Sequence, residues 1–175
     1  MTDQAVREID FEEVRKLDTI NFLGHDFAIF RDIKDIIPLY DTPLRISSTI
    51  VCVTLSGSIL LCVNACDYDV NGTWLVVLLP KSVFRYNNMT ADFKGLFIVV
   101  SPHFMKEVLP QLQSILPMFF YTLNNPCTSL EEEETDRLRE YHNLLWEHLE
   151  HDRIPFQREI AQNLLKVLCY EICSI

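Results

Sequence analysis

Between Thr49 and Ser101 short apolar runs alternate with turn residues, and after Ser101 the sequence changes to helical periodicity that continues to its last residue. The runs are rich in β-branched and aromatic residues, which favours strands, and they occupy residues 50–55, 59–64, 73–80, 83–89 and 96–101. Turn-forming residues separate them, among them Ser56-Gly57 and Asn71-Gly72. Short strands at this spacing close most easily into a small barrel or a two-sheet sandwich, whose interior can hold one small ligand.

The chain is long and apolar enough for one domain with a substantial core, at 175 residues of which 49% are hydrophobic. Its net charge is −10, and its pI is near 4.9. A chain with this charge repels a phosphate backbone. We therefore expect that it does not bind DNA or RNA by itself.

Membrane and secretory signals are not evident in the sequence. No run approaches the roughly 18 consecutive apolar residues of a membrane span, and the first ten residues lack the pattern of a secretory signal. Of the six cysteines, Cys52 and Cys62 lie within strand runs, and Cys169 and Cys173 lie one helical turn apart. Buried free thiols explain this placement better than disulfides do. These features predict a cytoplasmic protein without a membrane partner.

Several helices are predicted around the strand-rich centre. Asp10 resembles the N-cap of a short helix that reaches about Leu17, and Ser101-Pro102 resembles a second helix start. Residues 115–127 are predicted to form an irregular apolar connection. Ser129 and Glu132 then predict a capping box and a helix to about Glu150.

The last predicted helix spans residues 155–175 and is apolar over more than half of its circumference. Such a helix must bury two sides. One side is expected to cover the strand region and the other to contact a second copy of the chain. The edge formed by Leu165, Leu168 and Cys169 is the predicted dimer contact.

The sequence resembles the N-terminal, cupin-type effector-binding and dimerisation domain of AraC-family transcription regulators, in the version common in Bacteroides-like bacteria. The stretches that carry the resemblance cover nearly the whole chain: the strand from Arg45 to Ser56-Gly57 and residues 26–36, 72–80, 92–105, 126–145 and 160–175. The resemblance implies a mostly β fold with C-terminal α-helices, namely a cupin-like (double-stranded β-helix) barrel over about residues 20–101 and a helical dimerisation region over residues 102–175. It also implies that residues 1–175 form a single regulatory domain, and that a basic C-terminal domain with two helix-turn-helix motifs is absent from this chain.

Metal and catalytic sites have little support in the sequence. Cupin enzymes hold a metal with His and Glu side chains from adjacent strands. This sequence has no His between Asp26 and Pro102, and His25 and His103 flank the strand region singly. His142, His148 and His151 are interpreted as part of a solvated helix face. We therefore predict no metal, no cofactor and no catalytic residues.

Polar residues within the strand runs are the candidates for a ligand site. Arg45 at a strand start, and Arg85 and Tyr86 within a strand, can place donors at the mouth of a barrel. Alternation puts Arg85 and Tyr86 on opposite faces. Tyr86 is the preferred inward residue, Arg45 its predicted partner for a polar or anionic metabolite, and Trp74 a stacking wall.

Three functions remain open at this point. The first is an effector-sensing and dimerising domain, whose ligand modulates DNA-binding domains that are not in this chain. The second is a standalone cupin enzyme, such as a metal-independent isomerase. The third is an oligomerisation module whose interior is filled. A downstream basic region with two helix-turn-helix patterns distinguishes the first from the others.

Overall fold

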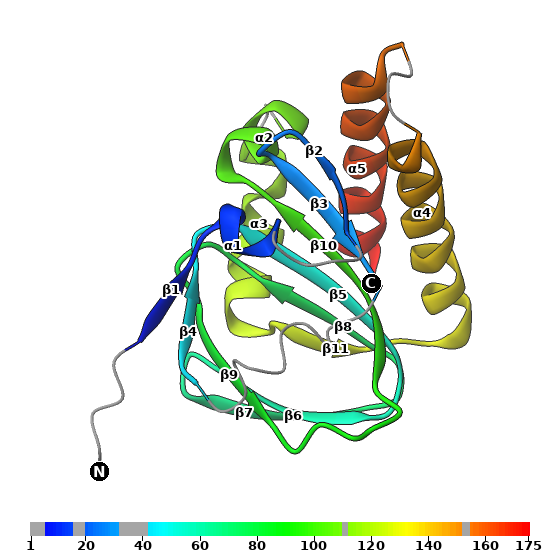
Figure 1. Ribbon diagram of the computed structural model, residues 1–175. Helices are drawn as coiled ribbons and strands as arrows, with labels where there is room; N and C mark the ends of the chain where they lie inside the picture. The colour runs from blue at the N-terminus through cyan, green and yellow to red at the C-terminus, as the bar shows by residue number, and fades with distance from the viewer. Residues whose placement is uncertain (1–5, 16–19, 32–41, 110–111, 152–154) are drawn as a thin grey trace.

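Two β-sheets face each other, and helices cover the outer face of the larger sheet (Figure 1). The computed structural model describes residues 6–15, 20–31, 42–109, 112–151 and 155–175. In Figure 1 the long helices α4 (Glu132–Glu150) and α5 (Gln157–Ser174) lie side by side, and they pack against each other. The arrangement is therefore three layers: a small sheet, a large sheet and a helical layer.

The smaller sheet has five strands and forms one wall of the space between the sheets. Its spatial order is β1 (Arg7–Ile9), β4 (Leu44–Ile46), β9 (Val83–Asn87), β6 (Ser58–Val63) and β7 (Cys66–Asn71). The pair β1 and β4 is parallel, and the other pairs are antiparallel.

The larger sheet has six strands and is antiparallel throughout. Its order is β11 (Cys127–Ser129), β8 (Trp74–Leu78), β5 (Thr49–Ser56), β10 (Lys94–Val100), β3 (Phe27–Phe30) and β2 (Ile20–Leu23). Three shorter helices complete the described structure: α1 (Phe11–Val14), α2 (Pro102–Val108) and α3 (Leu112–Asn124).

The larger sheet is apolar on both faces because its strands alternate between two cores. On β10, Phe97 and Val99 point toward the smaller sheet, while Leu96, Ile98 and Val100 point toward the helices. The same alternation holds on β3, β5 and β8. Strands buried on both faces read as continuous apolar runs, which explains why these segments stand out in the sequence.

The turn between β5 and β6 requires glycine. Gly57 has φ of +76°, in the left-handed region that side chains disfavour. A Cβ at this position would also lie 2.5 Å from the Cα of Phe93. The Ser56-Gly57 pair thus forms the tight turn that the sequence predicted.

The predicted fold class is confirmed, since the chain is mostly β with C-terminal helices, and the five apolar runs correspond to β5, β6, β8, β9 and β10. The strands form two sheets, and no closed barrel is found among the described residues. The helix starts at Asp10 and Ser101 are confirmed, because both side chains accept hydrogen bonds from backbone N–H groups of the first turn. The end of the first helix near Leu17 and residues 32–36 of the 26–36 stretch lie outside the described residues.

Two local predictions are wrong. The segment expected to be irregular contains α3, which accommodates Pro117, followed by the edge strand β11. The capping box of α4 is formed by Glu131 and Glu134, not by Ser129 and Glu132, because Ser129 pairs with Trp74 in the larger sheet.

No helix among the described residues has the length and hydropathy needed to cross a membrane.

Candidate functional site: the space between the sheets

The inner faces of the two sheets form an apolar lining. The larger sheet contributes Ala28, Phe30, Cys52, Val76, Leu78, Phe97 and Val99, and the smaller sheet contributes Leu44, Ile59, Leu61, Val63, Val70 and Tyr86. Ile9 and the α1 residue Phe11 pack into the same core. These inward side chains come from strands far apart in the sequence and meet in one core between the two sheets.

Tyr86 brings a hydroxyl group into this lining. It lies opposite Leu61 on β6 and is 5% exposed. Burial raises the pKa of its phenol to about 12, so the hydroxyl stays protonated and can donate a hydrogen bond. Burial likewise raises the pKa of the Cys127 thiol to about 12 and raises the pKa of the Cys52 thiol, so both stay neutral. The buried part of the inner face therefore carries the neutral phenol of Tyr86 and two neutral thiols among hydrocarbon, and the half-buried Tyr68 packs against the same cluster.

Trp74 lies at the edge of the same core. Its ring packs against the inner cluster and is partly buried, and its indole Nε1 donates to the main-chain oxygen of Asn71 at 3.1 Å. The predicted role of Trp74 as a wall residue fits this location, and its contact with a ligand stays a prediction.

Arg45 does not share a site with Tyr86. On β4, Leu44 and Ile46 are buried while Arg45 is exposed, and its Nη1 lies 3.6 Å from Glu8 Oε1. Leu44 pairs with Phe84, two residues before Tyr86 and on the same face of β9. Arg45 and Tyr86 thus lie on opposite faces of the smaller sheet. The prediction that the two side chains converge is therefore wrong, and the guanidinium group of Arg45 does not reach the inner face, where it would bind an anionic ligand.

The predicted dimer contact is also corrected. Leu165, Leu168 and Cys169 are 1%, 2% and 9% exposed because they pack in the core between the helices and the larger sheet. Side chains buried within the chain cannot contact a second copy of it. The exposed apolar side chains of the helix pair are instead Leu144 of α4 and Ile160, Val167 and Tyr170 of α5.

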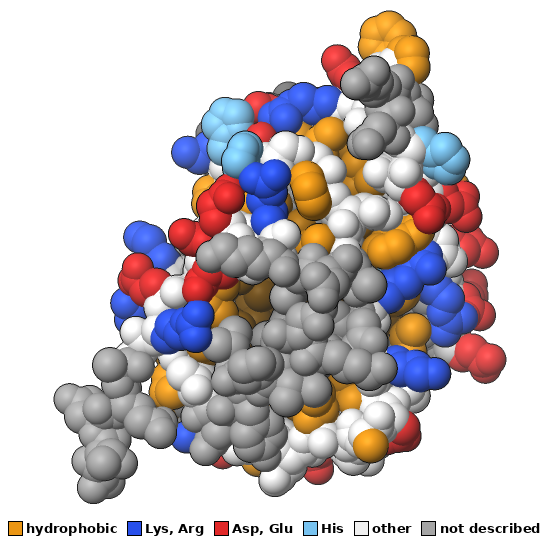
Figure 2. Space-filling view, viewed as in Figure 1, with side chains coloured by type: hydrophobic (Ala, Val, Ile, Leu, Met, Phe, Trp, Pro, Cys, Tyr) orange, Lys and Arg blue, Asp and Glu red, His pale blue; other side chains and the backbone are white. Residues whose placement is uncertain are grey.

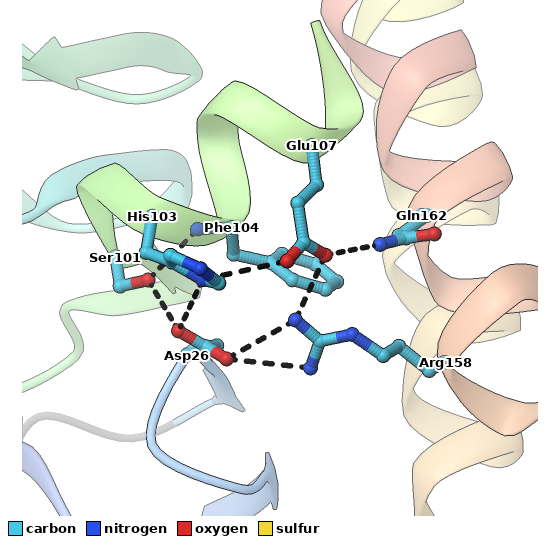
Figure 3. A network of polar contacts seen from close by, with 7 residues as sticks. All are labelled: Asp26, Ser101, His103, Phe104, Glu107, Arg158 and Gln162. Carbon is cyan, nitrogen blue, oxygen red and sulfur yellow. Dashed lines mark hydrogen bonds and ion pairs between the residues drawn. The ribbon is translucent and has the colours of Figure 1, made fainter. Parts of the chain in front are cut away.

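A network of polar contacts joins the start of α5 to the larger sheet and to α2 (Figure 3). Asp26, in the turn before β3, accepts hydrogen bonds from Ser101 Oγ at 2.8 Å and from the Arg158 guanidinium at 3.3 Å. Arg158 also donates to Glu107 Oε2 at 2.8 Å, and its guanidinium lies over the Phe104 ring, 4.8 Å from the centroid. One side chain of α5 thus bridges two acidic groups on two other elements.

The charges in this network stabilise one another. Partial burial opposes ionisation of Asp26, but hydrogen bonds from Ser101 and Arg158 and nearby positive charge hold its pKa below the ordinary value. His103 Nδ1 lies 3.4 Å from Glu107 and 3.6 Å from Asp26. Sequence reasoning missed this network, because only the fold brings positions 26, 107 and 158 together.

Among the described residues, His, Cys, Asp and Glu side chains form no group of three or more that could hold a metal ion. His25 is exposed, and its Nδ1 lies 2.5 Å from Glu12 Oε1. His142, interpreted from the sequence as part of a solvated helix face, is instead buried on the inner side of α4. The first turn of α4 carries Glu132, Glu133 and Glu134, and Figure 2 shows acidic side chains along the edge of the molecule on the side where Figure 1 places α4. This edge disfavours contact with nucleic acid.

No protein-family model matches the sequence, and a search of curated proteins gives no match. Comparison with solved structures does give matches. An apo variant of ToxT from Vibrio cholerae superimposes with a TM-score of 0.54 and 12% sequence identity, over 88% of this chain and 57% of that chain. The chain shares its fold with ToxT.

Two further structures are similar. Wild-type ToxT from Vibrio cholerae with a bound unsaturated fatty acid gives a TM-score of 0.53 and 14% identity, over 88% of this chain and 55% of that chain. The AraC-like transcriptional activator CuxR gives a TM-score of 0.42 and 14% identity, over 83% of this chain and 49% of that chain. The chain spans a little more than half the length of the ToxT chains it matches.

Proposed function

We propose that this chain is the effector-sensing and dimerising domain of a bacterial AraC-type transcription regulator. The observation that carries the proposal is the double-sided larger sheet, whose inner face packs in the core between the sheets and whose outer face packs in the core beneath the helices. The sequence resemblance to AraC-family regulators and the fold shared with ToxT support it. ToxT is itself a regulator of that family.

The larger sheet offers a physical route from ligand to helix. A ligand between the sheets would press on Phe97 and Val99, and the neighbouring residue Ile98 packs in the core beneath the helices. Close-packed cores transmit such shifts because they have little free volume. A ligand that binds one arrangement better would therefore shift the population of helix positions.

The lining favours a mostly apolar effector. The sequence suggested a polar or anionic metabolite, but Arg45 faces outward and the buried inner lining is hydrocarbon with the Tyr86 hydroxyl and two thiols. A long hydrocarbon body with a single polar group suits such walls. One ToxT structure contains an unsaturated fatty acid, and this class is our first candidate effector.

Dimerisation is proposed through the exposed side of the helix pair. Leu144 is 50% exposed, Ile160 39% and Val167 43%. The α5 positions 160, 164 and 167 recur at helical spacing on one face. Arg137 Nε and Glu171 Oε2, 3.6 Å apart, join α4 to α5. An apolar stripe of this kind on a surface helix is typical of subunit contacts.

DNA binding is assigned to a further domain. The net charge of −10 opposes binding by this chain, and the matched ToxT chains are nearly twice as long as the part that superimposes. We propose that α5 passes the effector signal to such a domain, with the Asp26, Glu107 and Arg158 contacts anchoring its first turns.

Thermal unfolding in the presence of oleate tests the effector site. A ligand at 100 times its Kd stabilises the folded state by about 2.7 kcal/mol. We expect Tyr86→Phe to weaken oleate binding, since it removes the inner hydroxyl, while the unliganded protein stays folded. The matched control Tyr141→Phe changes a half-buried tyrosine of α4 and should leave binding unchanged. Oleate binding that is equally strong in both variants would place the site elsewhere.

A further inference from the structure

A concave site lies on the helix side of the larger sheet, away from the core between the two sheets. This groove has a volume of about 690 Å³. Its floor includes Leu75 and Val77, which point to the opposite face of β8 from Val76 and Leu78. Tyr121 of α3 and Tyr170 and Cys173 of α5 form its sides. The groove is thus a feature separate from the proposed effector site.

The groove has the dimensions and surface of a small-molecule site. Sites for drug-sized ligands enclose roughly 300–1,000 Å³ and combine apolar walls with a few polar groups. Here no Asp, Glu, Lys, Arg or His side chain is part of the described lining, and Thr128 supplies a hydroxyl. Tyr121 is 60% exposed and Tyr170 47% exposed, so both of these lining rings are accessible to a ligand from solvent.

The lining also selects a class of ligand. An ionised group placed here would lose hydration without gaining a counter-charge, which is costly. Two tyrosine rings from different helices offer faces and edges for stacking with a flat ring system. We propose that this groove binds a neutral small molecule with a planar aromatic body, held between Tyr121 and Tyr170 over the outer face of β8. The proposal does not depend on the effector site or on a regulatory role.

Nile red, a neutral planar aromatic dye, is a suitable probe, and the two exposed cysteines Cys173 and Cys66 report its position. Cys173 lines the groove, whereas Cys66 lies on β7 in the other sheet. We expect saturable binding of one dye per chain by fluorescence titration. At saturation, N-ethylmaleimide should modify Cys173 at least about 5-fold more slowly, as expected for a residue covered by the ligand, and Cys66 at its original rate.

Variants of the groove complete the test. Tyr170→Ala removes one exposed ring and Thr128→Trp fills the space, and each should weaken dye binding by about 10-fold, the size of a typical loss for a central aromatic contact. The control Phe156→Ala changes an aromatic that is 73% exposed, just before the same helix and outside the groove, and should leave the affinity unchanged.

Three results would overturn the proposal. The first is the absence of saturable dye binding. The second is dye binding that leaves the reactivity of Cys173 unchanged, or that protects Cys66 as strongly as Cys173. The third is a dye affinity that neither Tyr170→Ala nor Thr128→Trp reduces. Because Tyr170 is exposed, its replacement remains informative even where Thr128→Trp fails to fold.

Discussion

The imidazole Nε2 of His142 lies 3.3 Å from the main-chain carbonyl oxygen of Phe30, across the boundary between α4 and the larger sheet. A carbonyl can only accept, so Nε2 carries the proton of the neutral ring. His142 is 2% exposed and stacks near Trp146, and its Nδ1 has no hydrogen-bond partner among the described residues. Burial, with a smaller contribution from the Arg31 charge, lowers the pKa of His142 to about 4.

This burial predicts a loss of stability in mild acid. In the unfolded chain His142 becomes protonated below a pKa of about 6.5, whereas in the folded chain it becomes protonated only below about pH 4. The free energy of unfolding should therefore fall as pH drops from about 6.5 to about 4, by roughly 3 kcal/mol from this residue, and not further below. Urea denaturation across this range measures the slope, which His142→Gln should largely remove. An unchanged slope in the variant would assign the pH dependence to other groups.

Arg158 is predicted to stabilise the packing of α5 against the larger sheet and α2, because its planar guanidinium group donates to both Asp26 and Glu107. Arg158→Ala should lower the free energy of unfolding by about 1–2 kcal/mol, because it removes partly exposed contacts with Asp26 and Glu107 and the stacking on Phe104. Arg158→Lys should restore only part of the loss, since an ammonium group cannot reproduce the fork. The control Arg139→Ala breaks an exposed pair within α4 and should cost less than about 0.5 kcal/mol. Equal effects at the two arginines would contradict the bridging role.

The exposed stripe of the helix pair, and not the buried edge, should control association. Val167→Glu places a charge on the stripe and is expected to give folded monomers, as measured by light scattering at tens of micromolar protein. Leu165→Glu should instead unfold the chain, because Leu165 is 1% exposed. The control Lys106→Glu alters an exposed residue of α2 and should remain dimeric. A monomeric wild-type chain would contradict the proposed dimer.

The chain by itself should not bind duplex DNA. Its net charge is −10, and acidic side chains line the edge of α4. Titration of labelled duplex at low salt is expected to show no saturable binding with a Kd below about 1 μM, which is tighter than the usual non-specific range. Saturable binding below that value, lost at higher salt, would count against the assignment of DNA contacts to another domain.

The central strands β5, β8 and β10 of the larger sheet were predictable because burial on both faces turns them into continuous apolar runs. The polar strand β7, Cys66–Asn71, carries no such signal, since three of its side chains are charged or aromatic and most are exposed. The helix α3 was missed because Pro117 argues against a helix interior. Of the site residues, alternation correctly separates Tyr86 from Arg85, but the direction of Arg45 depends on its register against β9, which the sequence does not encode locally.

The dimer contact was misplaced for a related reason. A helix that is apolar over most of its circumference does not reveal which side meets its own sheet. On α5 that side is Ala161, Leu165, Leu168 and Cys169, and the partner-facing side is proposed to contain Ile160 and Val167. Only the placement of α4 and α2 against α5 distinguishes them.

Hydrogen–deuterium exchange with and without oleate tests the central claim most directly, because it reports the effector site and the response of the helix together. We predict slower exchange in peptides covering β9 and β10, which carry Tyr86, Phe97 and Val99, and a changed rate in α5, which the ligand does not touch. Protection confined to the outer surface, or protection of β9 and β10 with α5 unaffected, would contradict an effector-sensing domain that signals through its last helix.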